Sequence, residues 1–221
     1  MILFTCVIIC IILWIYYFHY YKIQTDVKLF IDDAMYHVKT GDLICFKAFN
    51  NFNSVFFGCY FGHVGVVYAP PGEEPMLFEA NGVEHMNLRE HHPKSGMFLT
   101  PLADRLRKYK GICYWKPLEH PVSDDLERNY GKFINYCLDN FHYDTAVFKE
   151  AFKNGTGIAK CTKNTNCGQL TYLSLIKLGL LDISDYDNCY FHYLRFVCNI
   201  QELKNNRYVD FIQLIDHPFR E

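Results

Sequence analysis

The stretch FGHVGVVY, residues 61–68, is the part of the sequence from which the fold is best inferred. Its valines and its tyrosine favour a β-strand, because such side chains pack well on a pleated surface. His63 stands where that strand begins. Its ring is either an ordinary part-buried group whose nitrogens bind nearby backbone atoms, or a group that projects from the sheet to do chemistry. The choice between these interpretations depends on which other side chains the fold places beside His63.

The composition is that of a folded protein. The chain has 221 residues, of which 50% are hydrophobic and 17% aromatic, and its formal net charge is -2. Such a chain can bury a core of ordinary density, so one domain plus an appendage is expected. Basic residues number 22 against 24 acidic ones, with no basic run. This balance gives no electrostatic basis for a nucleic-acid partner.

The appendage is at the amino end. Residues 1–21 (MILFTCVIICIILWIYYFHYY) carry no charged side chain and are apolar almost throughout. As a helix rising ~1.5 Å per residue, the segment is about long enough to cross a hydrocarbon core of ~30 Å. A cleaved signal peptide is the alternative, but there is no basic n-region, and bulky residues stand where small ones should precede a cleavage site. We therefore predict an uncleaved, single-pass transmembrane anchor.

The residues that flank the anchor indicate its orientation, and the spacing of the cysteines indicates the state of the thiols. Lys22 and Lys28 come after the span and no Lys or Arg precedes it, which favours a cytoplasmic body. The ten cysteines lack the regular, dense spacing of a disulfide scaffold, so reduced thiols are expected. Asn154-Gly155-Thr156 is a glycosylation sequon that would matter only if the body were luminal.

The segment after the anchor is predicted to form strands. Short apolar runs bounded by turn residues are typical of strands, and Asn81-Gly82 invites a tight turn between two such runs. We therefore expect an antiparallel sheet or a small barrel. The predicted strands are residues 43–46, 63–68, 76–80, 83–88 and 111–116.

Two helices are predicted downstream. The first begins after Ser123-Asp124-Asp125, whose serine oxygen and carboxylates suit a helix N-terminus. Its apolar side is formed at spacings of three and four by Leu126, Tyr130, Phe133, Ile134, Cys137, Leu138 and Phe141. The second helix opens at Cys167, has Lys177 in its last turn, and ends near Gly179. Strands followed by helices indicate an α+β domain.

Cys167 is the candidate nucleophile. Thr165-Asn166 supplies capping residues just before it, so its thiol would lie in the first helical turn, where free N–H groups and the helix dipole stabilise a thiolate. The alternative is that Cys167 is one of ten cysteines and opens a helix by chance. Cys161, in the polar loop upstream, is the competing nucleophile.

A nucleophilic cysteine needs a base, and the base needs an orienting group. Antiparallel pairing across the 69–75 loop brings the start of the strand at His63 beside the end of the next strand, where Glu79 lies. The two side chains can then share a face of the sheet, and the carboxylate can fix the imidazole tautomer. This arrangement predicts that His63 has a chemical role.

Metal binding is a further alternative for the same region. Cys59 and His63 are four residues apart, and His91-His92 is a second pair of nitrogen ligands. Neither pair is accompanied by a second pair of ligands at the spacing that is typical of a zinc site. We therefore expect neither a metal nor a cofactor.

Five segments, taken in order, resemble the landmarks of the NlpC-type papain-like superfamily, and more narrowly of its circularly permuted branch. In that branch the histidine precedes the cysteine, and its members include lecithin:retinol acyltransferase, bacterial lipid-directed hydrolases and poxviral proteins. The segments are Gly41-Asp42-Leu43-Ile44, Gly62-His63-Val64-Gly65-Val66-Val67, Leu77-Phe78-Glu79-Ala80, Tyr143-Asp144 and Asn166-Cys167-Gly168-Gln169-Leu170.

The resemblance implies a role for each matching position. Cys167 matches the nucleophile, His63 the general base, and Glu79 the polar residue that orients the histidine. Asp42 and Asp144 match positions whose role is structural, and Asp42 is expected to brace the turn before the first strand. Gly168-Gln169 departs from the family, in which Ser-Glu often follows the nucleophile.

The resemblance also implies a function. We expect a membrane-anchored thiol hydrolase or acyltransferase that acts on an amide or ester through a Cys-His-Glu triad and a thioester acyl-enzyme. The anchor favours a lipid or lipid-modified substrate near the bilayer. The alternative is a catalytically idle, membrane-tethered binding or structural module of the same fold. The expected parts are an anchor (1–21), a connector (22–38), a permuted papain-like domain (39–185) and a C-terminal extension packed on it (186–221).

Overall fold

The computed structural model describes residues 5, 7–13, 25, 27–47, 60–81, 96–143, 164–182 and 200–216. Several predictions concern residues outside these ranges. They include the strand at 83–88 and Asp144 of the family landmarks. Cys161 and the pair His91-His92 also lie outside the described residues.

The amino-terminal segment is described only in part. Residues 7–13 are helical, and the rest of the predicted span, except residue 5, lies outside the described ranges. Among the described helices, none is both long enough and apolar enough to cross a membrane. The transmembrane anchor therefore remains a prediction from the sequence.

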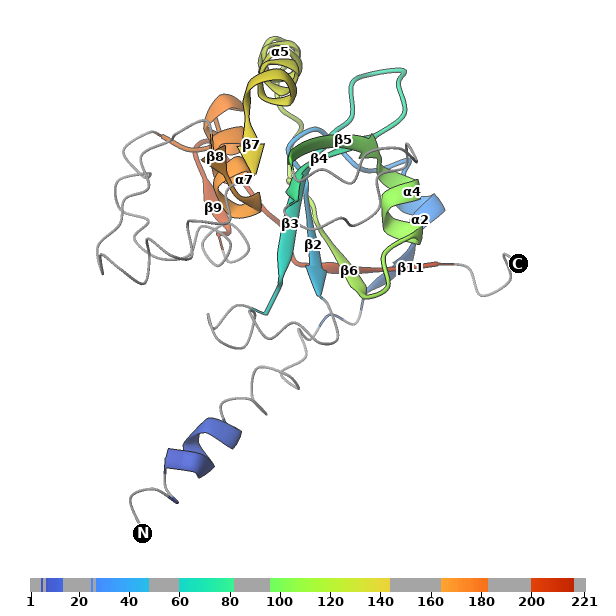
Figure 1. The fold of residues 1–221 in the computed structure, drawn as a ribbon. Coiled ribbons are helices and arrows are strands. Elements are labelled where there is room, and N and C mark those ends of the chain that lie inside the picture. Colours follow the sequence, from blue (N-terminus) through green and yellow to red (C-terminus); the bar gives the residue numbers. More distant parts are fainter. Residues whose placement is uncertain are drawn as a thin grey trace.

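The body of the protein is a seven-stranded sheet with helices on both faces (Figure 1). Neighbouring strands are antiparallel except for the parallel pair at one edge, β1 and β11. In their order across the sheet, the strands are β1 (Lys28–Phe30), β11 (Ile212–Ile215), β6 (Ile112–Lys116), β2 (Leu43–Lys47), β3 (His63–Tyr68), β4 (Met76–Asn81) and β5 (Gly96–Pro101). The α+β class and the sheet are thus confirmed, and β1 and β5 are its two edges, so the small barrel is not the form adopted.

Two core clusters lie on opposite faces of the sheet. One face is covered by α5 (Asp124–Asn140) and α7 (Cys167–Lys177), and the other by α2 (Ile31–Ala34) and α4 (Leu102–Arg107). The split follows the period-2 alternation of the strands, in which successive side chains point to opposite faces. In β3, Val64 and Val66 join the α5/α7 cluster and Val67 joins the α2/α4 cluster.

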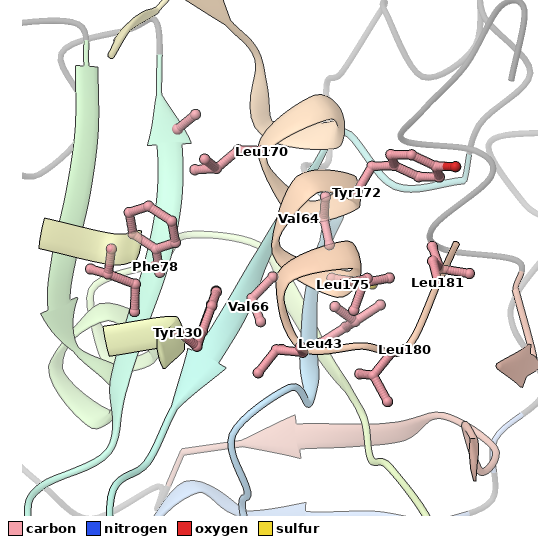
Figure 2. Packing of buried hydrophobic residues seen from close by; sticks show 14 of the residues in the cluster. Leu43, Val64, Val66, Phe78, Tyr130, Leu170, Tyr172, Leu175, Leu180 and Leu181 are labelled. Atoms are coloured by element: carbon pink, nitrogen blue, oxygen red, sulfur yellow. The ribbon is translucent and has the colours of Figure 1, made fainter. Parts of the chain in front are cut away.

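Helix α7 lies directly over β3 (Figure 2). Leu170, Tyr172 and Leu175 are buried in the same core cluster as Val64 and Val66 of the strand. The helix is buried nearly all round: only Lys177 is exposed, and the polar Gln169, Thr171 and Ser174 are among its buried residues. This packing fixes where the first turn of α7 lies relative to β3.

The predicted first helix is confirmed as α5, with two corrections. Tyr130, Ile134 and Cys137 of its apolar side are buried, but Leu138 is 37% exposed because it lies at the margin of that side. Ser123 is the N-cap residue, yet its side chain makes no capping hydrogen bond. The acidic residues of the first turn remain to stabilise this N-terminus through the helix dipole.

The chain segments that flank the predicted catalytic domain join the same sheet. Residues 28–38, within the predicted connector, contribute β1 and α2, and β11 comes from the C-terminal extension. β11 pairs with β6 on one side and with β1 on the other. The extension therefore adds a strand to the domain rather than only covering it.

Asp42 braces the turn before β2, as the resemblance implied. Its carboxylate is fully buried and accepts three hydrogen bonds. Oδ2 accepts from Lys39 N and Trp115 Nε1, both at 2.8 Å, and Oδ1 accepts from Leu118 N at 2.7 Å. One side chain thus ties the turn to β6 and to the segment that follows it.

Candidate active site

Cys167 lies in the first turn of α7. Asn166 caps the helix: its side chain accepts from Gln169 N at 3.0 Å, and the Gln169 side chain accepts from Asn166 N at 3.2 Å. This reciprocal pair is a capping box, which fixes where the helix begins. The predicted cap is therefore confirmed, and Cys167 is a free cysteine of intermediate exposure. The backbone N–H groups of the first turn have no acceptor within the helix itself.

His63 is the first residue of β3 and its side chain is 18% exposed. Its Nε2 atom lies 2.6 Å from Glu79 Oε2. Phe46, opposite His63 on β2, packs beside the imidazole with ring centroids 5.4 Å apart. The histidine is thus held by a carboxylate and an aromatic ring, which answers the question raised by the sequence in favour of a specifically oriented side chain.

The register of β3 and β4 explains the contact with Glu79. Val66 is opposite Phe78. Continuing that antiparallel register places Glu79 opposite Gly65, two residues from His63 on the same face. No side chain at position 65 stands between the two. The predicted sharing of a face by His63 and Glu79 is confirmed.

Cys167 is near enough to His63 to affect the ionisation of its imidazole. The negative charge and the hydrogen-bonding capacity of the Cys167 sulfur both act to raise the pKa of His63. Because Glu79 occupies Nε2, the nitrogen left for the sulfur is Nδ1. The structure therefore brings together all three residues that the sequence singled out.

Arg105 of α4 is a fourth member that the sequence reasoning missed. Its Nε donates to Glu79 Oε1 at 2.6 Å, and its Nη2 donates to Glu79 Oε2 at 3.2 Å. Both side chains are only 3% exposed. A signal was present, since residue 105 lies three and one positions from the buried Leu102 and Leu106. An arginine at such a position is most often solvated, so the pattern did not single it out.

The ionisation of His63 and Glu79 follows from these contacts. Burial acts to lower the pKa of His63, but the charge and hydrogen bond of Cys167, and then those of Glu79, raise it to about 9. Burial acts to raise the pKa of Glu79, but the hydrogen bond and charge of His63, followed by Arg105, lower it to about 2. The site therefore favours an imidazolium at His63 beside an ionised Glu79.

These shifts define a pH window for the stability that the site contributes. The pKa of His63 rises from 6.5 to about 9, so its contribution is complete below pH 6.5 and is lost as the pH rises through 9. The pKa of Glu79 falls from 4.5 to about 2, so its contribution is complete above pH 4.5 and is lost as the pH falls toward 2. Both contributions are complete between pH 4.5 and 6.5.

Metal ligation finds no support in the described part of the chain. Within it, no group of three or more His, Cys, Asp or Glu side chains is arranged to hold a metal ion. Cys59 and His91-His92, which raised this alternative, lie outside the described residues.

Comparisons with known proteins identify no family. No family model matches the chain, and no curated protein matches it. Among solved structures, the chain is similar to the metalloprotein yiiX (DUF1105) from Escherichia coli O157:H7, with a TM-score of 0.44 and 16% identity over 65% of this chain and 68% of that one. A likeness at this level assigns neither an activity nor a ligand to this chain.

Proposed function

We propose that this protein is a thiol hydrolase or acyltransferase of the circularly permuted, NlpC-type papain-like kind, with Cys167, His63 and Glu79 as its triad. The observation that carries the proposal is the placement of His63, which is bound to Glu79 at 2.6 Å and lies near enough to Cys167 for the sulfur to raise its pKa. A nucleophile at a helix start, a base beside it and a carboxylate behind the base are the parts that nucleophilic catalysis requires. The order of histidine before cysteine matches the permuted branch.

Each residue has a defined task in the proposed reaction. The Cys167 thiolate attacks the carbonyl carbon of an ester or amide, and the carbonyl oxygen becomes an oxyanion near the backbone N–H groups at the start of α7. His63 gives its proton to the leaving alcohol or amine as the C–O or C–N bond breaks. The acyl group remains on the sulfur as a thioester. Water or another acceptor then takes the acyl group, with His63 accepting the proton of the attacking group.

We further propose that the domain is tethered to a membrane by residues 1–21 and acts on a lipid or lipid-modified substrate. The segment has no charged side chain. In its described part, large apolar side chains are 41–60% exposed, and an apolar phase would cover them. They are Val7, Ile8, Ile9, Ile11, Ile12 and Leu13. Lys22 and Lys28, which follow the segment, favour a body on the cytoplasmic side.

Deletion of residues 1–21 is expected to release the remainder from membranes as a soluble, folded protein. None of the described residues of that segment belongs to a core cluster, so its loss removes none of the core packing that the structure describes. Sedimentation after a high-salt wash, with the full chain as control, measures this. A truncated chain that still sediments with membranes contradicts the single anchor.

A thiol-reactive activity probe tests the proposed chemistry. Labelling of the full chain at neutral pH is expected to fall to background in Cys167→Ser, and by at least roughly tenfold in His63→Ala, because the imidazolium that stabilises the thiolate is lost. Cys161→Ser is the matched control and should label like the wild type. Labelling spread evenly over many cysteines would instead support the idle module.

A further inference from the structure

We propose that Arg105 is a positioning residue of the site: it keeps the Glu79 carboxylate ionised and turned toward His63, and thereby acts on Cys167 through two other side chains. The inference rests on the proposed function, because it assigns a role within the same site. Arg105 reaches neither the sulfur nor the imidazole by any of its described hydrogen bonds, so it is not itself a catalytic residue.

The geometry of the contact is the first support. Arg105 donates from Nε to one carboxylate oxygen of Glu79 at 2.6 Å and from Nη2 to the other at 3.2 Å. Two parallel N–H bonds from a planar guanidinium fix the plane of a carboxylate as well as its position. The oxygen that accepts from Nη2 is Oε2, which also binds His63. Rotation of this carboxylate away from the imidazole would therefore break the fork.

The guanidinium is itself held in place by aromatic rings. Its central carbon lies 4.6 Å from the ring centroid of Phe46 and 5.6 Å from that of Tyr109. Phe46 is the same residue that packs beside His63. Arginine is suited to such a site because it stacks on ring faces while its N–H groups point elsewhere. One aromatic residue therefore contacts both the cation and the imidazole that share Glu79.

Charge is the second support. A carboxylate that is 3% exposed has a strong tendency to take up a proton, since burial disfavours the charged form. The groups that face Glu79 or Arg105 are His63 of β3, Cys167 of α7 through His63, Cys113 of β6, and Tyr109 after α4. Of all these groups, only Arg105 keeps its charge at every accessible pH. It therefore holds Glu79 ionised while its neighbours titrate.

The consequence reaches the sulfur in two steps. If Glu79 takes up a proton, His63 loses the anion that favours its imidazolium form. The thiolate of Cys167 then loses part of the stabilisation that an imidazolium gives it. Removal of Arg105 should therefore make the thiolate form of the site disappear at a higher pH on the acid side.

The pH dependence of Cys167 alkylation by iodoacetamide measures this in the full chain in detergent, with the peptide that contains Cys167 followed by mass spectrometry. Arg105→Gln is expected to move the acid limb of the rate profile upward by roughly one pH unit or more. Arg105→Lys should move it less, because lysine keeps the charge but cannot form the fork. The matched control is Arg107→Gln, which removes an arginine of the same helix that pairs with Asp32 instead. Its profile should superimpose on the wild type.

A merely structural Arg105 gives a different result. If the residue only attaches α4 to the sheet, Arg105→Gln lowers the unfolding temperature and leaves the acid limb of the folded protein where it was, which overturns the proposal. The double variant with Glu79→Gln is equally decisive. Once Glu79 cannot ionise, removal of Arg105 should cause no further shift, and an undiminished shift shows that Arg105 acts without Glu79.

A second readout does not depend on any reaction at the sulfur. In NMR titrations, the low-pH inflection of the His63 imidazole signals reports protonation of Glu79, and it is expected to move upward in Arg105→Lys and further in Arg105→Gln. If Arg105→Gln does not fold, the lysine variant decides by the same shift. An idle Cys167 in the probe experiment refutes the proposed function and leaves this comparison valid. An unmoved inflection refutes the role of Arg105 alone.

Discussion

Replacement of Cys167 by serine is expected to lower turnover of an activated acyl ester by roughly a thousandfold or more, which is the scale of loss when a member of a catalytic triad is removed. Serine keeps a small polar group in the first turn of α7 but forms no thiolate beside His63. The capping box between Asn166 and Gln169 does not involve the sulfur, so the helix start is unchanged. The unfolding temperature should therefore stay within a few degrees of the wild type, corresponding to less than about 1 kcal/mol.

Turnover and thermal unfolding of the same preparations check this expectation together. Cys161→Ser serves as the matched control, because it removes the competing thiol and should leave turnover unchanged. Full turnover in Cys167→Ser combined with its loss in Cys161→Ser would mean that the nucleophile is the cysteine of the upstream loop. Loss of turnover accompanied by unfolding would show only that position 167 matters for the fold.

The local parts of the site could be predicted from the sequence. The strand at His63, the strand at Glu79 and the helix at Cys167 each follow from short-range patterns: valine-rich or short apolar runs, turn residues, and capping residues just before the helix. Pairing of two consecutive strands across a short loop then sets which residues share a face. For this reason the contact between His63 and Glu79 could be anticipated without any knowledge of the remaining fold.

The parts that could not be predicted depend on contacts between distant segments. Arg105 reaches Glu79 because α4 packs on the face of the sheet opposite α7, and no local pattern specifies that packing. β1 and β11 are separated by most of the chain and pair with each other at one edge of the sheet. Each is short, with three residues in β1 and four in β11, so neither carries a clear strand pattern of its own. Long-range pairings of this kind are set by the whole core and leave little trace in either segment alone.

Asp42→Asn is expected to lower the free energy of unfolding by roughly 2–5 kcal/mol, because it leaves one or two buried N–H groups without an acceptor. In the wild type, Oδ1 accepts one hydrogen bond and Oδ2 accepts two. An amide offers only one oxygen, so its NH₂ group must face either Leu118 N or the pair formed by Lys39 N and Trp115 Nε1. Two donors then oppose each other in a site with no exposed surface.

Urea denaturation of the chain in detergent at pH 7.5 measures this loss. Burial raises the pKa of Asp42 to about 6, so at that pH the wild-type residue is ionised and its carboxylate accepts all three bonds. Asp125→Asn is the matched control: its side chain is 82% exposed and pairs with Arg128 on the same helix, so the change should cost no more than about 1 kcal/mol. Equal effects of the two substitutions would mean that the turn before β2 holds without the Asp42 carboxylate. A large effect confined to Asp42 would show that this turn, from which β2 runs beside β3 to place Phe46 against His63, depends on a single buried side chain.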